Sequence, residues 1–244
     1  MDITVWDRLI SIAIYVFSLI FYNKLNRYFS EIEAQQKLEK PQEETENSNL
    51  KNNPYLKRYE EHKKVYKSYY IGLYLVGFLM TVYIGNPMIA IVLASCLTAS
   101  EDDIKSLYVY DYYSYLPGII ILIAIISKFC TYGSYPFGDI IFALIPILFC
   151  ILTVFTRGLA DTFMMLTFGL YGFYINNPFV IILGYMIAYI WQFCFQLIMC
   201  KRLHIKYKER RDKNGLRLPF MPALSIGFIL AFVLQNAVFI SLTF

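Results

Sequence analysis

Residues 100–106 of the chain read Ser-Glu-Asp-Asp-Ile-Lys-Ser and close an apolar run that starts at Pro87. Residues 158–161 read Gly-Leu-Ala-Asp, and another long apolar run follows them. Each stretch therefore places a carboxylate, Asp103 or Asp161, at the edge of a predicted membrane span. A charged side chain in hydrocarbon is costly, so an acid kept at such a place is a candidate for function.

The composition around these stretches is that of a membrane protein. Of the 244 residues, 58% are hydrophobic and 16% are charged, and the mean hydropathy is +0.49. A bilayer core requires ~20 apolar residues per helix. Several of the apolar segments fall short of that length, so tilted or re-entrant pieces are possible. The apolar segments are 3–22, 68–84, 87–100, 114–129, 137–156, 161–175, 179–199 and 220–243.

These segments predict an all-α polytopic bundle of about eight transmembrane helices. Residues 1–22 form the first helix in this interpretation, 23–67 a charged cytoplasmic loop and 68–244 the core. The first segment lacks a basic start and a small-residue cleavage site, so we expect a retained span and not a signal peptide. Residues 31–67 are rich in Glu, Gln, Asn and Lys, which is typical of a mobile loop with some helix at either end.

Lysine and arginine predict how the bundle sits in the membrane. Residues 24–67 contain ten of these cations and residues 201–217 contain eight, while Lys105 and Arg157 lie in two further connections. If the chain crosses the membrane eight times starting from outside, all four regions face the cytoplasm, as the positive-inside rule requires. Both termini are then outside, and both candidate carboxylates lie at the cytoplasmic face of a multi-pass cell-membrane protein.

The residue inventory disfavours several other classes of function. The five cysteines form no Cys-x-x-Cys pair, and His62 and His204 are the only histidines, so we expect no metal site. Basic residues share their loops with acids, which disfavours nucleic acid as a partner. No glycine-rich cofactor loop is visible, and no cofactor is expected.

Two carboxylates at one membrane face can hydrolyse a peptide bond. Held around one water, they cannot both ionise easily and therefore share a proton. The ionised member can take a proton from water, and the protonated member can hydrogen-bond to the scissile carbonyl and later donate. Other readings exist for each acid: Asp161 could cap a helix, and Asp103 could lie in an exposed acidic turn. Asp139 also follows a glycine, but the topology puts it at the outer face, where we expect a helix-start residue.

Three stretches occur in a suggestive order. Residues 103–111 read Asp-Ile-Lys-Ser-Leu-Tyr-Val-Tyr-Asp, residues 158–166 read Gly-Leu-Ala-Asp-Thr-Phe-Met-Met-Leu, and residues 218–227 read Leu-Pro-Phe-Met-Pro-Ala-Leu-Ser-Ile-Gly. Together they resemble the motifs of the type IV prepilin peptidases and their shorter relatives, which are membrane aspartyl proteases with a Gly-x-Gly-Asp signature. Besides the two acids, the residues that carry the resemblance are Lys105, Ser106, Gly158, Ala160, Pro219, Phe220 and Pro222.

The resemblance implies an endopeptidase with Asp103 and Asp161 as its catalytic pair. Its register favours Asp103 over Asp102. The implied substrate is a membrane-embedded prepilin-like or pseudopilin chain, whose leader peptide is cleaved at the cytoplasmic face. Tyr110 stands where the family usually has proline, and Ala160 replaces the second glycine of the signature.

The resemblance does not extend to every family feature. Longer members carry Cys-x-x-Cys pairs in the first cytoplasmic loop and methylate the new N-terminus, whereas residues 23–67 contain no cysteine. A zinc-supported loop is therefore not expected, and methyltransferase activity has no support. Two alternatives stay open: a non-enzymatic transporter or assembly protein that uses buried carboxylates, and an inactive peptidase homologue.

Overall fold

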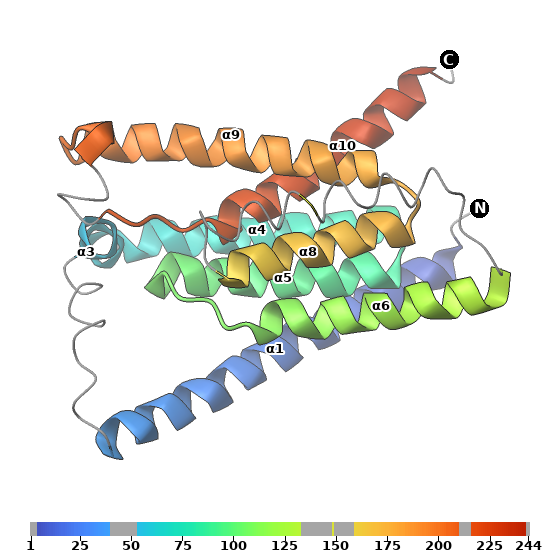
Figure 1. Ribbon diagram of the computed structural model, residues 1–244, viewed down its shortest axis with the longest axis horizontal. Coiled ribbons are helices and arrows are strands. Elements are labelled where there is room, and N and C mark those ends of the chain that lie inside the picture. Colours follow the sequence, from blue (N-terminus) through green and yellow to red (C-terminus); the bar gives the residue numbers. More distant parts are fainter. Residues whose placement is uncertain (1–3, 40–52, 133–147, 149–158, 210–215, 243–244) are drawn as a thin grey trace.

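The computed structural model describes residues 4–39, 53–132, 148, 159–209 and 216–242 (Figure 1). Within these ranges the α-helices are α1 (Val5–Glu39), α3 (Pro54–Glu61), α4 (Lys63–Ile84), α5 (Pro87–Ser106), α6 (Tyr112–Tyr132), α8 (Leu159–Tyr174), α9 (Pro178–Arg202) and α10 (Met221–Leu242). A short 3-10 helix, η1 (Tyr207–Glu209), follows α9. No strand occurs in the described part of the chain, which confirms the predicted all-α membrane bundle.

Four of the described helices, α1, α4, α6 and α9, are long and apolar enough to cross a membrane. Large apolar side chains on their outer faces stay exposed, among them Phe17, Ile123 and Ile190. Exposed apolar surface on this scale is expected where lipid replaces water as the surrounding solvent. Among the other described helices, α8 has 16 residues and α5 ends in charged residues, whereas α10 is apolar over its 22 residues.

Asparagine–proline pairs start three of the helices. The side chains of Asn53, Asn86 and Asn177 accept hydrogen bonds from backbone N–H groups in the first turns of α3, α5 and α9, and a proline follows each of them. Asparagine is a preferred N-cap, and proline fits the first helical position because it has no N–H to leave unpaired. The pairs at residues 86–87 and 177–178, which lie between consecutive apolar segments of the sequence, are therefore helix starts.

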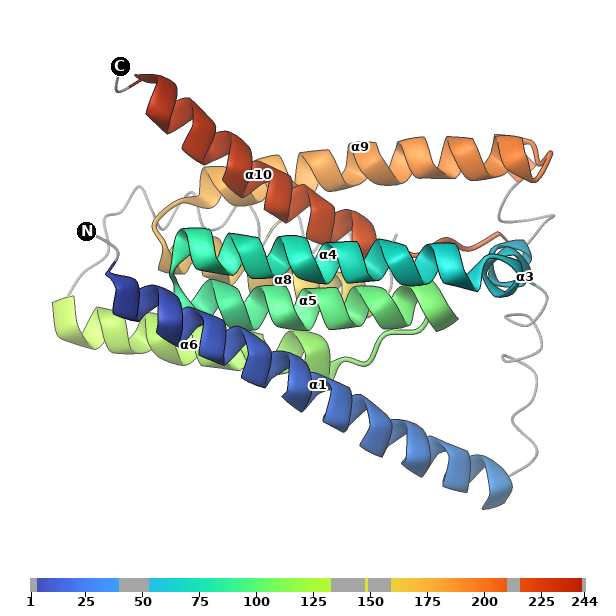
Figure 2. The same ribbon diagram turned by 180° about the vertical axis from the view of Figure 1, so that it is seen from behind.

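Helix α5 lies at the centre of the bundle and contacts α1, α4, α6, α8 and α10 (Figures 1 and 2). Its side chains are buried on all faces, as expected for a helix that is surrounded by protein. Many of them are small, which lets neighbouring backbones approach closely. The small buried residues are Ala90, Ala94, Ser95, Cys96, Ala99 and Ser100.

The described helices run in two directions along the bundle. Helices α1, α5 and α9 run toward the end of the bundle that carries α3 and η1, and α4, α6, α8 and α10 run away from it (Figures 1 and 2). This end is called here the basic end, because Lys57, Arg58, Lys201 and Arg202 lie there. These directions agree with the predicted order of the described spans, and the predicted fifth span, 137–156, lies outside the described residues apart from Leu148.

Helix α1 extends beyond the boundary expected at residue 22 and continues to Glu39. Residues 23–39 contain no glycine or proline that would end the helix. The predicted helix at either end of the charged loop is thus present, as the second half of α1 and as α3.

Candidate active site

The two candidate acids lie where three helix termini meet at the basic end. Asp103 is in the last turn of α5, and Asp161 is in the first turn of α8. Helix α10 begins beside Asp103, so the third motif of the sequence reaches the first. The three stretches that resemble one family are therefore brought to the same end of the bundle.

Asp103 is buried, with an exposed fraction of 6%. Its Oδ2 atom accepts hydrogen bonds from the backbone N–H groups of Phe220, at 2.6 Å, and Met221, at 2.8 Å. The first N–H groups of a helix have no partner inside that helix and carry partial positive charge, so they favour a carboxylate. Asp103 is therefore not the exposed acidic turn that the sequence left open as an alternative.

Asp161 lies within electrostatic range of Asp103 and also of Cys96. Cys96 precedes Asp103 by about two turns of α5. The side chain of Asp161 is half-buried, in contrast to Asp103. The preceding residue, Ala160, belongs to α8 and has no positive φ, so its backbone does not need glycine. The Ala160 carbonyl accepts a hydrogen bond from Ser114 Oγ at 3.3 Å, which ties this turn to α6.

The neighbouring acid Asp102 points elsewhere. Its carboxylate accepts hydrogen bonds from Asn26 Nδ2, at 2.9 Å, and from Tyr113 OH, at 2.5 Å. These partners come from α1 and α6, so Asp102 links three helices. Asp103, the other of the two adjacent aspartates, interacts electrostatically with Asp161.

Glu101 faces a third direction, toward α4. Its carboxylate accepts a hydrogen bond from Tyr74 OH at 2.6 Å and forms an ion pair with Lys105 one turn later. The Lys105 ammonium also lies over the ring of Tyr70, 5.3 Å from its centroid. Lys105, one of the predicted site residues, therefore belongs to the α4–α5 contact.

A small polar cluster that sequence reasoning missed adjoins Asp103. Ser225 Oγ lies 2.8 Å from Ser100 Oγ and 3.1 Å from Cys96 Sγ. Cys96, Ser100 and Asp103 are spaced by four and three residues, so they share one face of α5. This spacing of small polar residues is the sequence signal that could have predicted the cluster, because it places them on the face of α5 that meets α10.

The other predicted site residues contribute no side-chain hydrogen bond to Asp103 among the contacts of the described residues. Ser106 is exposed, and its Oγ donates to the carbonyl of Asp102 at the end of α5. Phe220 is buried, and its ring lies 5.5 Å from that of Tyr189. Pro219 and Pro222 line a cavity that neither Asp103 nor Asp161 lines. Gly158 lies outside the described residues.

Tyr110, which stands in place of the family's proline, packs in an aromatic cluster. Its ring stacks on that of Tyr112 with a centroid distance of 5.3 Å, and Phe29 of α1 lies beside both rings. The connection from α5 to α6 is thereby held against α1. Burial raises the pKa of Tyr110 to about 12, with the nearby Glu33 carboxylate adding to the effect, so the phenol is neutral at physiological pH.

Helix α3 supports the turn that carries Asp103. Tyr55 is buried, and its hydroxyl donates to the carbonyl of Ile104 at 3.1 Å. Burial raises the pKa of Tyr55, and a negative charge on the nearby Asp103 adds to the effect. Asn53 Nδ2 donates to the carbonyl of Arg217 at 3.2 Å, so α3 contacts both the end of α5 and the segment that leads into α10.

The described residues contain no group of three or more His, Cys, Asp or Glu side chains that could hold a metal ion. Comparisons with protein-family models, with curated proteins and with solved structures gave no match.

Proposed function

We propose that the protein is an intramembrane aspartyl endopeptidase with Asp103 and Asp161 as its catalytic pair. The observation that carries this proposal is a buried carboxylate at the end of α5, held by two backbone N–H groups of α10, with a second carboxylate near it at the start of α8, which packs against α5. The two acids are 58 residues apart in sequence, and each lies at the end of a helix of the bundle. Buried acids placed together in this way are uncommon unless chemistry needs them.

The chemistry follows from a proton that the pair shares. Two nearby carboxylates favour a state with one proton between them. The ionised member takes a proton from the attacking water, while the protonated member donates a hydrogen bond to the scissile carbonyl and then a proton to the leaving amine. The N–H groups of Phe220 and Met221 fix the orientation of one carboxylate, which is the pre-organisation that such catalysis requires.

The resemblance to prepilin peptidases supplies the proposed substrate. A prepilin-like or pseudopilin chain would lie in the membrane by its own apolar helix, with its basic leader at the basic end of the bundle. The positive-inside distribution of the loops supports a cytoplasmic site. In this proposal the bond that is cut lies between the leader and the apolar helix.

The test compares Asp103→Asn and Asp161→Asn with a matched control, Asp102→Asn, in cells that also express a pilin-like substrate. Asparagine keeps an oxygen that can accept the N–H groups of α10, so Asp103→Asn removes the charge while leaving the helix cap in place. Each of the first two variants should lower processing by about 10²-fold or more. The Asp102→Asn control should keep processing the substrate.

Substrate size on a gel and the amount of folded enzyme in the membrane are the two readouts. Continued processing by either Asp103→Asn or Asp161→Asn, at wild-type enzyme levels, would overturn the catalytic assignment. Absence of processing by the wild-type enzyme, together with a proton flux that depends on Asp161, would favour the transporter alternative.

A further inference from the structure

A cavity of about 270 Å³ lies at the basic end beside the start of α10, and neither Asp103 nor Asp161 lines it. Its walls come from α3, α4, α9 and the first turn of α10, and they are mostly aromatic and aliphatic. Pro219 and Pro222 form one wall, and Ile104, the residue after Asp103, forms part of another. The cavity is therefore separate from the acid pair but shares the backbone segments that hold it.

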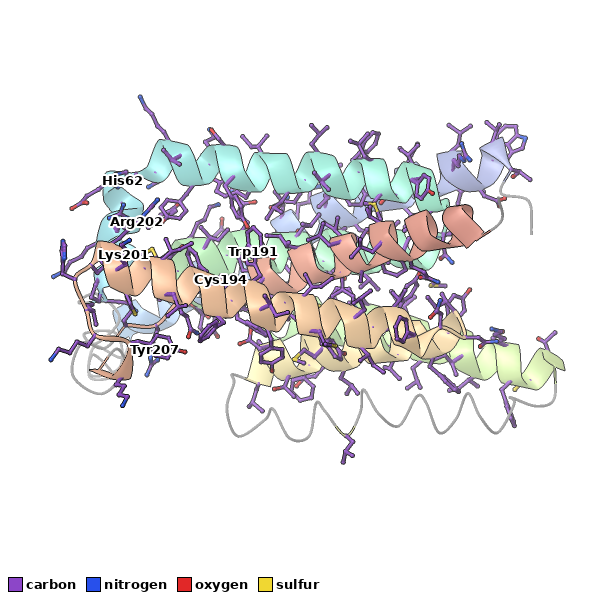
Figure 3. All side chains as sticks on the ribbon, turned by 90° about the horizontal axis from the view of Figure 1, so that it is seen from above. His62, Trp191, Cys194, Lys201, Arg202 and Tyr207 are labelled. Carbon is purple, nitrogen blue, oxygen red and sulfur yellow. The ribbon has the colours of Figure 1, made fainter. Side chains whose placement is uncertain are left out.

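The cavity reaches the outer surface of the bundle between α4 and α9. These two helices do not pack tightly on each other, and α10 begins between them (Figure 3). On the α9 side, Trp191 and Ile198 both line the cavity and are 45% and 50% exposed. On the α4 side, Val65 and Tyr69 also line the cavity, and they are 67% and 38% exposed. In a membrane this opening faces lipid.

Two arginines that line the cavity have no ion-pair partner among the described residues. They are Arg58 of α3 and Arg202 of α9. Both lie close enough to the Tyr66 hydroxyl to act on it electrostatically, so they flank one point of the rim. Figure 3 shows Arg202 close to His62 and Lys201 at this end, with Trp191 further along α9.

We propose that this cavity binds an anionic phospholipid, with the phosphate between Arg58 and Arg202 and an acyl chain along the groove toward Trp191. The cationic rim and the apolar interior match the two ends of such a molecule, and the lateral opening gives it a way in. Basic pockets between helices at the cytoplasmic side are suited to acidic headgroups. The same rim would repel the basic leader of a pilin-like substrate, so that leader is not the occupant.

The proposal does not depend on the peptidase function, and Trp191 provides a direct readout. The chain has two tryptophans, so a Trp6→Phe background leaves Trp191 as the only one. The protein is placed in vesicles with a small, equal fraction of lipid brominated in mid-chain, which quenches nearby tryptophan. One set carries bromine on phosphatidylglycerol, the other on phosphatidylcholine. We expect the anionic lipid to compete for Trp191 with an advantage of about fivefold or more.

Two double variants test which cations supply that advantage. Arg58→Gln with Arg202→Gln should abolish the preference. Lys57→Gln with Lys206→Gln removes the same charge from exposed positions at the same end that do not line the cavity, and this control should keep the preference. Unchanged Trp191 emission in lipid free of bromine checks that each variant is folded.

Three results would overturn the proposal. The first is equal quenching by the two lipids in the otherwise unmodified protein, which would mean a generic lipid-facing surface. The second is an equal loss of preference in both double variants, which would mean a diffuse surface charge effect. The third is absence of quenching by either lipid, which would mean that protein, from the substrate or a second copy, fills the groove.

Discussion

Three consecutive acids at the end of α5 face three different parts of the molecule. Successive residues of a helix point about 100° apart, because 3.6 residues make one turn. Glu101 therefore meets α4, Asp102 meets α1 and α6, and Asp103 meets α10 and Asp161. Three adjacent acids that look equivalent in the sequence therefore have different roles: Glu101 and Asp102 form structural contacts, and Asp103 is the candidate catalytic group.

The structural role of Asp102 predicts the effect of removing its partner. Tyr113→Phe deletes the hydroxyl that donates to Asp102 Oδ2 and leaves a half-buried carboxylate with Asn26 as its remaining donor. This should lower the free energy of unfolding by about 1–3 kcal/mol. Tyr115→Phe is the control, since Tyr115 is 43% exposed and its change should stay within about 0.5 kcal/mol.

Denaturation of the purified variants in detergent, followed by circular dichroism, measures both changes. Equal stability of the Tyr113 and Tyr115 variants would show that the Asp102 contact is not a stabilising link between α1, α5 and α6.

At the residue scale, the sequence predicts which acids are candidates for function, but it does not predict which groups they contact. The cost of a charge at a membrane edge drew attention to the two acidic stretches, and the resemblance then favoured Asp103 over Asp102. The donors to Asp103 are more than a hundred residues away in sequence, and the helix-end N–H groups that supply them carry no side-chain signal. The substitution of Ala160 for glycine was also readable, but its acceptability depends on a helical backbone that only the fold shows.

Among the elements, α9 and α10 pack most extensively, and their closest approach uses glycine. A Cβ atom on Gly227 would lie 2.4 Å from the carbonyl oxygen of Gly184 and 2.8 Å from the backbone nitrogen of Ala188. Gly184 and Ala188 are four residues apart, which is the small-xxx-small spacing that lets membrane helices pack backbone to backbone. The start of α10, and with it the cap on Asp103, depends on this crossing.

Gly227→Ala should therefore be strongly destabilising, whereas Gly72→Ala should not. At Gly227 the new methyl meets backbone, which cannot move aside, and overpacking of this kind costs about 1–3 kcal/mol or more. At Gly72 of α4 nothing lies within 4 Å of the new methyl, so the change should be neutral or slightly favourable. Thermal unfolding in detergent compares the two, and similar midpoints would contradict the close α9–α10 crossing.

Helix α3 is held at the basic end by a buried phenol, which makes its anchoring sensitive to alkali. Burial raises the pKa of Tyr55 above its ordinary value of 10.0, so this group stays protonated in the folded state after it would ionise in the unfolded chain. Its contribution to stability is complete below about pH 10 and falls as the pH rises further.

Tyr55→Phe should therefore flatten the decline of stability above pH 10. Measured as the free energy of unfolding against pH, the slope should differ from that of the wild-type protein by about one proton. The variant also loses the hydrogen bond to the Ile104 carbonyl, so it should be less stable at neutral pH. Parallel slopes would mean that Tyr55 is exposed to solvent in the folded protein.

At the scale of the whole bundle, the directions of the described helices agree with the order of spans that charge and hydropathy predicted. The apolar segments and the basic loops were sufficient for that order, since both effects act locally along the chain. The central place of α5 was not predictable in the same way. Its small residues permit burial on all sides, but which helices surround it is decided by contacts between segments that are distant in sequence.

The orientation in the membrane can be tested with single cysteines in a variant whose five native cysteines are replaced by alanine. Arg8→Cys lies at the end opposite the basic end, while Lys57→Cys and Lys206→Cys lie at the basic end. A maleimide that cannot cross membranes should label Arg8→Cys in intact cells, and the other two only after lysis. The reverse pattern would place the basic end, and the candidate active site, outside the cell.

The contact between Asp103 and the start of α10 joins the middle of the chain to its last helix. During synthesis on the ribosome, the pair of acids can come together as soon as α8 has entered the membrane. The nascent chain then still lacks the two N–H groups that orient one of them. Maturation of the site therefore waits for the final helix, and a protein stopped short of residue 220 would carry both acids without the cap that aligns them.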